Sequence, residues 1–187
     1  MTAAAVFPVE VAGVKRDLRL FTIKPGVQIA ILNILGDTEF VQATGKALAE
    51  KLKSHAFDII VTAEAKAIPI AHAVAVEMNN APYVVLRKTY KPYMGEALRS
   101  ETLSITTGEP QTLFLDQKDR ELIAGKRVCI LDDVISTGST LQGMRLILDK
   151  AGAIVTVEAA IFTEGDRAKW TNVVALGHLP VFIDGKA

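Results

Sequence analysis

The chain has 187 residues, half of them hydrophobic, and its 21 Lys and Arg residues balance 21 Asp and Glu residues, so the formal net charge is zero. This length allows one domain with a sizeable core, and the charge balance argues against a basic surface that binds nucleic acid or an anionic membrane. We find no signal peptide and no apolar run long enough to span a membrane, and the single cysteine, Cys129, predicts a reducing, cytoplasmic location.

The first elements predicted along the chain are a β-hairpin and a segment of ambiguous type. Residues 6–12 alternate loosely, Gly13 interrupts them, and the alternation resumes over residues 14–22. Lys24-Pro25-Gly26 ends this hairpin, and the apolar residues 27–35 fit a strand or a helix equally well. Asp37 is the expected N-cap of the first clear helix, which carries Val41, Thr44, Leu48 and Leu52 on one face.

Apolar strands and helices alternate from residue 37 to residue 163. Strands are predicted over residues 57–63, 83–86, 128–131 and 154–162, with helices over residues 68–78 and 141–150. This order predicts an α/β fold with a doubly wound parallel sheet. Between two of the strands, residues 102–107 and 111–115 are expected to form short strands within a mobile functional loop. Residues 173–175 and 180–183 are predicted as short strands near the C-terminus.

The stretch from Val128 to Thr140 carries the clearest functional signal. Four apolar residues run into Asp132 and Asp133, and a hydroxyl-rich loop containing Gly138 precedes the next helix. The free N–H groups and the dipole of a helix N-terminus favour an anion such as a phosphate. Two carboxylates would repel that phosphate and instead suit sugar hydroxyls or a magnesium ion. An ordinary capped turn needs only one hydroxyl side chain, so four of them around a glycine favour a phosphate site.

Basic residues follow two other predicted strands. Lys66 lies in the loop after residues 57–63, and Arg87, Lys88 and Lys91 follow residues 83–86. The C-terminal ends of parallel strands share one edge of a sheet, so these cations are expected to converge on a second phosphate group. The alternative is that they are solvated surface charges, as most basic residues are.

Together these residues resemble the type I phosphoribosyltransferases, whose signature for phosphoribosyl pyrophosphate (PRPP) is similar to the segment from Val128 to Thr140. The similarity covers about residues 37–165 and is closest to the adenine and xanthine branch. It implies the type I phosphoribosyltransferase fold in a single domain, residues 1–187. That domain would have a core over residues 37–165, a small hood from residues 1–36 and 166–187, and a flexible β-loop.

The resemblance also implies a reaction and a set of residue roles. The enzyme would transfer ribose 5-phosphate from PRPP to a purine base, adenine first among them, and release pyrophosphate, with Mg²⁺ carried by PRPP rather than held by protein ligands. It implies a homodimer without nucleic-acid or membrane partners. The catalytic residues would be Asp132, Asp133 and Lys91. The 5′-phosphate would bind Val134, Ile135, Ser136, Thr137, Gly138, Ser139 and Thr140, and the pyrophosphate would bind Ala65, Lys66, Arg87, Lys88 and Lys91.

The sequence departs from the family pattern at three places. Adenine enzymes carry arginine and glycine where this chain has Lys66 and Ala67, and their flexible-loop glutamate aligns with Thr106. Hypoxanthine-guanine enzymes carry an aspartate inside the PRPP loop where this chain has Ser136. These missing carboxylates motivate an alternative hypothesis, a PRPP-binding regulatory protein without transferase activity. Such a protein would act through a partner protein, since no helix-turn-helix is recognised ahead of the domain.

Overall fold

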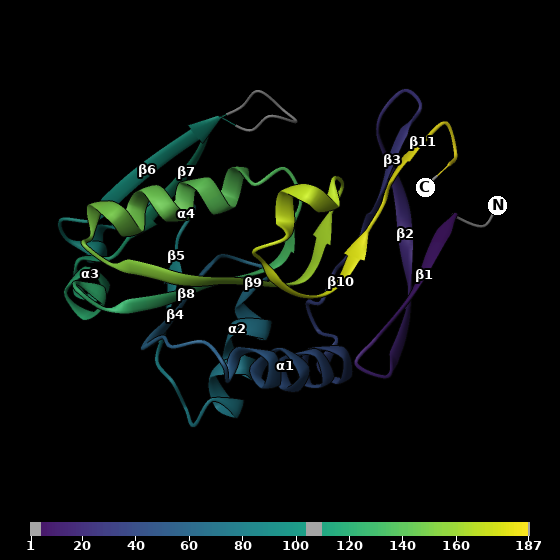
Figure 1. The fold of residues 1–187 in the computed structure, drawn as a ribbon. Coiled ribbons are helices and arrows are strands. Elements are labelled where there is room, and N and C mark those ends of the chain that lie inside the picture. Colours follow the sequence, from purple (N-terminus) through teal and green to yellow (C-terminus); the bar gives the residue numbers. More distant parts are fainter. Residues whose placement is uncertain (1–4, 104–109, 187) are drawn as a thin grey trace.

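Three sheets organise the computed structural model, which describes residues 5–103 and 110–186 (Figure 1). The central sheet has five strands in the order β10-β9-β8-β4-β5, and every neighbouring pair is parallel. The predicted α/β class with a parallel sheet is therefore confirmed. The strands are β4 (Ile59–Ala63), β5 (Tyr83–Leu86), β8 (Arg127–Ile135), β9 (Ile154–Glu164) and β10 (Val174–Leu179).

Helices cover both faces of the central sheet. α1 (Thr38–Leu52) and α2 (Ile68–Glu77) lie on one face, and α4 (Ser139–Lys150) lies on the other (Figure 1). The alternate side chains of β8 therefore enter two cores, Cys129 and Leu131 with the α1–α2 layer and Val128 and Ile130 with the α4 layer. Double coverage explains the continuous apolar run. Burial also raises the pKa of the Cys129 thiol to about 12, which keeps it protonated and unreactive.

Most element boundaries agree with the sequence-based expectations. Asp37 caps α1 by accepting a 3.2 Å hydrogen bond from the Phe40 N–H group. The ambiguous segment contains a strand, β3 (Val27–Ile31), and the connection over residues 116–125 contains a short helix, α3 (Gln117–Ile123). None of the helices in the described part of the chain is long and apolar enough to cross a membrane.

The two ends of the chain build a separate antiparallel sheet in the order β1-β2-β3-β11. It contains β1 (Val6–Val11), β2 (Val14–Lys24), β3 and β11 (Val181–Ile183), and the predicted N-terminal hairpin is confirmed. Residues 166–187, which were expected to belong to the hood as a whole, instead serve both sheets. β10 pairs with β9 along the edge of the central sheet, and only β11 pairs with β3. Arg16 on β2 links this sheet to α1 through a 2.7 Å ion pair with Asp37.

The third sheet is a hairpin of β6 (Leu98–Leu103) and β7 (Pro110–Leu115). The expected strand over residues 102–107 is wrong in its start, because pairing begins at Leu98; residues 104–109 lie outside the described residues. The hairpin is docked on α4, where Ser100 Oγ donates to the Gly143 carbonyl at 2.8 Å. Two backbone hydrogen bonds between Arg87 and Phe114 attach β7 to the end of β5. The described part of this segment is therefore anchored at both sides.

The contact between α1 and α2 generates a stability prediction. A Cβ atom added at Gly45 would lie 2.6 Å from the Cβ atom of Ala73, so the two helices approach too closely for any side chain there. Replacing a helical glycine by alanine usually stabilises a helix, but here overpacking should dominate. We expect Gly45→Ala to lower the free energy of unfolding by about 1–3 kcal/mol in urea denaturation. The control is Lys46→Ala on the exposed side of the same turn, which should change it by less than about 0.5 kcal/mol. A stabilised Gly45→Ala would contradict this packing.

Candidate functional site

The two acidic residues of the motif lie at the C-terminal end of β8. The strand continues through both of them to Ile135, so they are part of the sheet edge rather than of a loop. Asp133 is only 7% exposed, and its Oδ2 atom lies 3.0 Å from Lys66 Nζ. Lys66 also donates to the Leu32 carbonyl, just beyond β3, at 3.2 Å. Lys66 thus joins the end of β8 to the segment that follows β3 of the antiparallel sheet.

Asp132 is a strongly perturbed carboxyl group. The Asp133 N–H group donates to its Oδ1 atom at 2.9 Å. Burial, followed by the neighbouring charge of Asp133, raises the pKa of Asp132 well above its usual range, and the hydrogen bond from the Asp133 N–H group and the charge of Lys66 only partly oppose this. A carboxyl group perturbed by both burial and a like charge is typical of a functional site.

The loop after β8 forms a small cavity at the N-terminus of α4. This cavity, of about 80 Å³, is lined by Asp132 and by residues 134–141. Gly138 has a left-handed φ of 85° and directly precedes the helix, which turns the backbone sharply at this point. Thr137 Oγ1 and Ser139 Oγ are 3.0 Å apart. Backbone and hydroxyl donors therefore surround a space large enough for an anion at a helix N-terminus.

The basic residues after β5 are partly neutralised. Arg87 Nε lies 2.6 Å from Glu64 Oε2, and the Lys88 N–H group donates to the other oxygen of Glu64 at 2.6 Å. The sequence alone did not identify Glu64 as this partner. The hydrogen bond that Arg87 donates to Glu64 raises the pKa of Arg87 further. The charge of Arg87 is therefore already paired with the Glu64 carboxylate. An incoming anion would have to share Arg87 with Glu64 or displace Glu64 from it.

The remaining basic residues are less closely joined. The Lys88 side chain lines a cavity of about 210 Å³ together with Gln111 and Thr140, between β7 and α4. Ala65 is exposed and follows a cis peptide bond. Lys91 precedes a short 3₁₀ helix over Pro92–Met94, and its side chain makes no hydrogen bond or ion pair to any residue that the structure describes. The structure thus brings Lys66 to Asp133 but does not bring Lys91 to the acids.

A second carboxylate adjoins the loop and was not identified from the sequence. Glu164 ends β9, is 5% exposed, and accepts a 2.5 Å hydrogen bond from Ser136 Oγ. The Trp170 Nε1–H group donates to the Glu164 carbonyl at 3.1 Å, and the Trp170 ring lies against Gly138. Its position in the sequence could have identified it, because Glu164 ends an apolar strand and that strand was expected to lie in the same parallel sheet as the motif strand.

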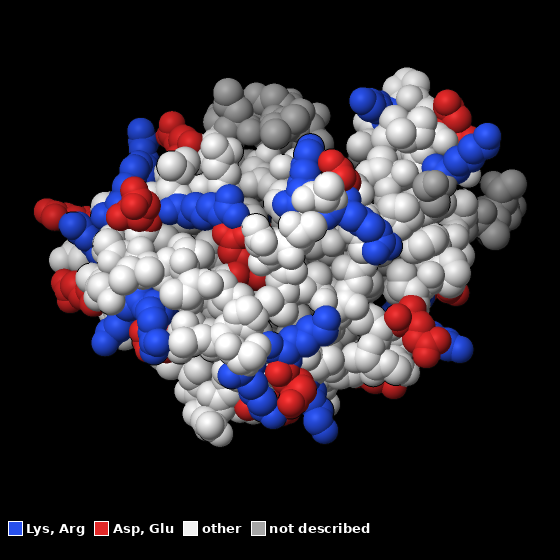
Figure 2. Space-filling model, viewed as in Figure 1, with Lys and Arg blue, Asp and Glu red and all other residues white. Residues whose placement is uncertain are grey.

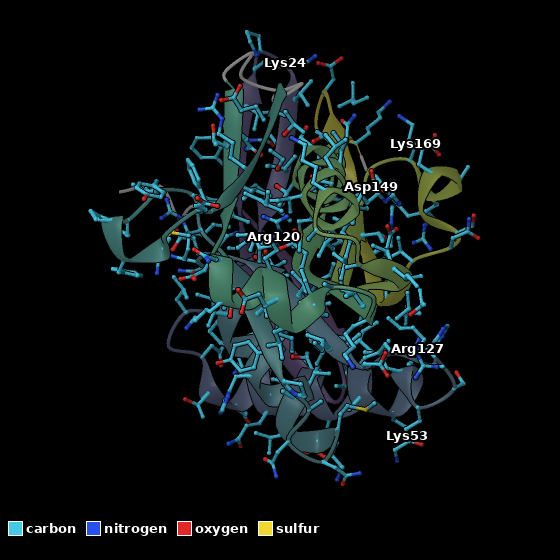
Figure 3. The ribbon with its side chains drawn as sticks, turned by 90° about the vertical axis from the view of Figure 1, so that its left-hand side faces the viewer. Lys24, Lys53, Arg120, Arg127, Asp149 and Lys169 are labelled. Carbon is cyan, nitrogen blue, oxygen red and sulfur yellow. The ribbon has the colours of Figure 1, made fainter. Side chains whose placement is uncertain are left out.

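Charged side chains are also found away from this site. Basic and acidic side chains are interspersed over the face drawn in Figure 2. Arg127, labelled in Figure 3, begins β8 at the opposite edge of the sheet from the acids and pairs with Asp58 at 2.7 Å. Within residues 5–103 and 110–186, no group of three or more His, Cys, Asp or Glu residues is arranged to hold a metal ion.

Comparison with known proteins identifies the family. The model of the phosphoribosyl transferase domain matches residues 31–175. The chain belongs to this family. The Bacillus subtilis purine biosynthesis transcriptional repressor PurR is 32% identical over 142 residues, which cover 73% of this chain and 49% of the repressor. The xanthine phosphoribosyltransferase of an Exiguobacterium species is 33% identical over 128 residues, covering 68% and 65% of the two chains.

Solved structures agree with the fold. Adenine phosphoribosyltransferase from Thermoanaerobacter pseudethanolicus superposes with a TM-score of 0.70 at 23% identity, covering 86% of this chain and 95% of the enzyme. The chain spans about half the length of the regulatory relatives that it matches. The family and its fold are therefore established.

The raised pKa of Asp132 predicts a stability change of defined sign. Its contribution to stability is present below the unfolded pKa of about 3.9 and is lost as the pH rises through the raised folded pKa. Asp132→Asn removes the burial of this charge, so we expect the variant to be more stable than the parent at pH 7.5. The expected gain is about 1–3 kcal/mol, the usual scale for a buried polar group with poor compensation. It should shrink toward zero near pH 4 in urea denaturation.

Asp58→Asn is the control of opposite sign. The hydrogen bonds from Arg127 lower the pKa of Asp58 to about 2, so its stabilising contribution is present above the unfolded pKa and is lost as the pH falls. This variant should be less stable than the parent at pH 7.5 and approach it near pH 2. A stability of Asp132→Asn that matches the parent at every pH would contradict the buried charge.

Proposed function

We propose that the chain transfers ribose 5-phosphate from PRPP to a purine base, with adenine as the first candidate, and releases pyrophosphate. The observation that carries this proposal is the acidic pair at the end of β8 directly beside the anion-sized cavity at the N-terminus of α4. A ribose 5-phosphate carries hydroxyl groups and a phosphate close together. The acidic pair suits the hydroxyls, and the adjoining cavity suits the phosphate. The names of the xanthine and adenine relatives support a purine as the acceptor.

The 5′-phosphate would occupy the loop from Ser136 to Thr140, with Val134 and Ile135 contributing backbone. Asp132 and Asp133 would accept hydrogen bonds from the ribose hydroxyls. As the bond to pyrophosphate breaks, positive charge develops on the ribose, and the two carboxylates would offset it. Preorganised charges of this kind contribute much of an enzyme's rate enhancement.

The pyrophosphate would lie toward Lys66 and the basic group Arg87, Lys88 and Lys91. Lys66 is held beside Asp133, which places a cation next to the ribose acids. Arg87 would exchange part of its contact with Glu64 for a phosphate oxygen. Together these cations would stabilise the negative charge on the leaving group.

Magnesium would enter bound to PRPP, where it supplies further positive charge to the pyrophosphate. The carboxylate oxygens of Asp132 and Asp133 are the chemistry that this ion prefers. Asp133 Oδ2 is buried and has Lys66 as its neighbour, so the protein would supply at most a small part of the coordination.

A homodimer in the cytoplasm remains a prediction, and light scattering of the purified protein would test the dimer.

Pyrophosphate release is the direct test of the transferase. We expect turnover with at least one of adenine, hypoxanthine, guanine and xanthine in the presence of PRPP and Mg²⁺. Silence with all four bases would contradict the proposed reaction.

A second candidate is a regulatory protein that binds PRPP without turnover. The relatives named as purine biosynthesis regulators, PurR among them, favour it, since they match this chain as well as the enzymes do. Calorimetry separates the two functions, because a regulator would bind PRPP and yet release no pyrophosphate with any base.

The two phosphate sites can be tested separately. Arg87→Ala should weaken binding of PRPP and pyrophosphate by about 10- to 100-fold, the scale of one charge-assisted hydrogen bond. It should leave binding of the nucleoside monophosphate nearly unchanged, because that ligand lacks the pyrophosphate. Thr140→Val should weaken both PRPP and the monophosphate, which share the 5′-phosphate. Equal, small effects of Arg87→Ala on both ligands would rule out the second phosphate site.

A further inference from the structure

The transfer leaves one chemical requirement that the groups described so far do not meet. As the purine ring nitrogen forms its bond to C1′ of the ribose, the base must lose a ring proton. The bond from C1′ to the pyrophosphate oxygen breaks, and its electron pair leaves with the pyrophosphate. Asp132 and Asp133 are assigned to the ribose and Lys66 to the leaving group, so another group must take the proton.

We propose that Ser136 and Glu164 form a proton relay to the base, in which the Ser136 hydroxyl accepts the ring proton while passing its own proton to Glu164. The contact that carries this inference is the 2.5 Å hydrogen bond from Ser136 Oγ to Glu164 Oε1. It rests on the transferase activity proposed above. No covalent intermediate is required, and the proton count balances, because Glu164 ends the step protonated.

Ser136 has the position that such a relay needs. It is the first residue after β8, so among the loop hydroxyls it is the nearest in the chain to Asp132 and Asp133, which would hold the ribose. The hydroxyls of Thr137, Ser139 and Thr140 lie farther along, at the helix end where the 5′-phosphate would sit. The Ser136 hydroxyl is already hydrogen-bonded to a carboxylate, so Ser136 would hold the 5′-phosphate through its backbone N–H group and keep its hydroxyl for the base.

Glu164 is built to hold a proton rather than to bind substrate. It is 5% exposed, and its side chain is joined to the loop by the hydrogen bond from Ser136 Oγ. Burial raises the pKa of Glu164, while the hydrogen bond from Ser136 and the charge of Lys66 oppose the increase. A carboxylate whose pKa lies nearer the working pH is a better general base. Glu164 is thus a positioning and proton-holding residue, and Ser136 is the group that touches the base.

The surroundings of Glu164 keep it in place. The Trp170 Nε1–H group donates to the Glu164 carbonyl and the Trp170 ring packs on Gly138, so one side chain contacts both the end of β9 and the loop. His178 on β10 is hydrogen-bonded to Thr163 Oγ1 at 2.9 Å and to the Gly165 carbonyl at 3.0 Å, on both sides of Glu164 in the chain. Burial, followed by the charge of Arg167, lowers the pKa of His178, and Lys66 is the charged residue that acts on Glu164.

Steady-state kinetics of Glu164→Gln test the relay. Glutamine keeps an oxygen that accepts from Ser136, so the loop stays held, but it cannot take the proton. We expect kcat to fall by about 100-fold or more, with KM for PRPP within threefold of the parent. The parent should lose activity as the pH falls and Glu164 becomes protonated, and the variant should lack that limb of the profile. Glu158→Gln, a carboxylate on the same strand bound to Arg145, is the matched control and should keep the parental kcat.

Two further variants separate a relay from a structural contact. Ser136→Ala should reduce kcat as Glu164→Gln does, and the double variant should be no worse than either single variant, because both belong to one path. Ser136→Asp combined with Glu164→Gln places a carboxylate at the loop itself and should restore part of the activity.

The outcomes distinguish this inference from the function on which it rests. A parent protein that is inactive with every purine overturns both. An active parent whose Glu164→Gln variant has parental kcat and an unchanged pH profile overturns the relay alone. So does a Glu164→Gln variant that loses PRPP affinity and kcat in the same proportion, because that result describes a loop that has lost its shape. If Glu164→Gln fails to fold, Ser136→Ala decides the question, and a parental kcat in that variant overturns the relay.

Discussion

The structure depends on how β8 is covered along its length. Its first half is buried between α1–α2 and α4, and its backbone pairs with β4 and β9. Its second half reaches the C-terminal end of the sheet, where Asp133 is buried and Asp132 is half-buried. Because the buried half of the strand is rigid, it fixes the positions of the charged groups at its other end. The same strand thus supplies both the core and the site.

Partial burial of charge is compensated by contacts that come from distant parts of the chain. Lys66 faces Asp133, Glu64 binds Arg87, and Ser136 binds Glu164. Each pair joins two neighbouring strand ends of the central sheet, so the residues that would recognise the ligand also tie the edge of the sheet together. A ligand rich in phosphate would compete with the carboxylate in the pair formed by Arg87, whereas the pair formed by Ser136 contains no cation to attract it. Substrate binding and proton transfer would therefore draw on different contacts.

Sequence patterns predicted the fold class and the motif well, for physical reasons. Runs buried on both faces are continuous, and strand-loop-helix transitions place hydroxyls and glycine together, so β8 and α4 could be recognised locally. Side-chain partners across the sheet edge could not be. Glu64 and Glu164 each end an apolar run with an ordinary carboxylate, and only strand order and register bring them to Arg87 and Ser136. The start of β6 was missed because its alternation is set by packing on α4 rather than by its own residues, and β10 was assigned to the wrong sheet for the same kind of reason.

The family contains both enzymes and regulators, and the residues of this chain bear on how one fold serves both. Binding PRPP requires the loop, the acids and the basic groups, all of which act on the ground state of the ligand. Turnover additionally requires a group that removes a proton while the bond to the base forms, and such a group contributes nothing to ground-state affinity. A chain that only binds PRPP therefore has no need for a carboxylate buried against the loop hydroxyl that lies nearest in the chain to the acidic pair, where it costs desolvation without adding a contact to the ligand. The presence of Glu164 at that position is thus easier to explain for an enzyme than for a sensor.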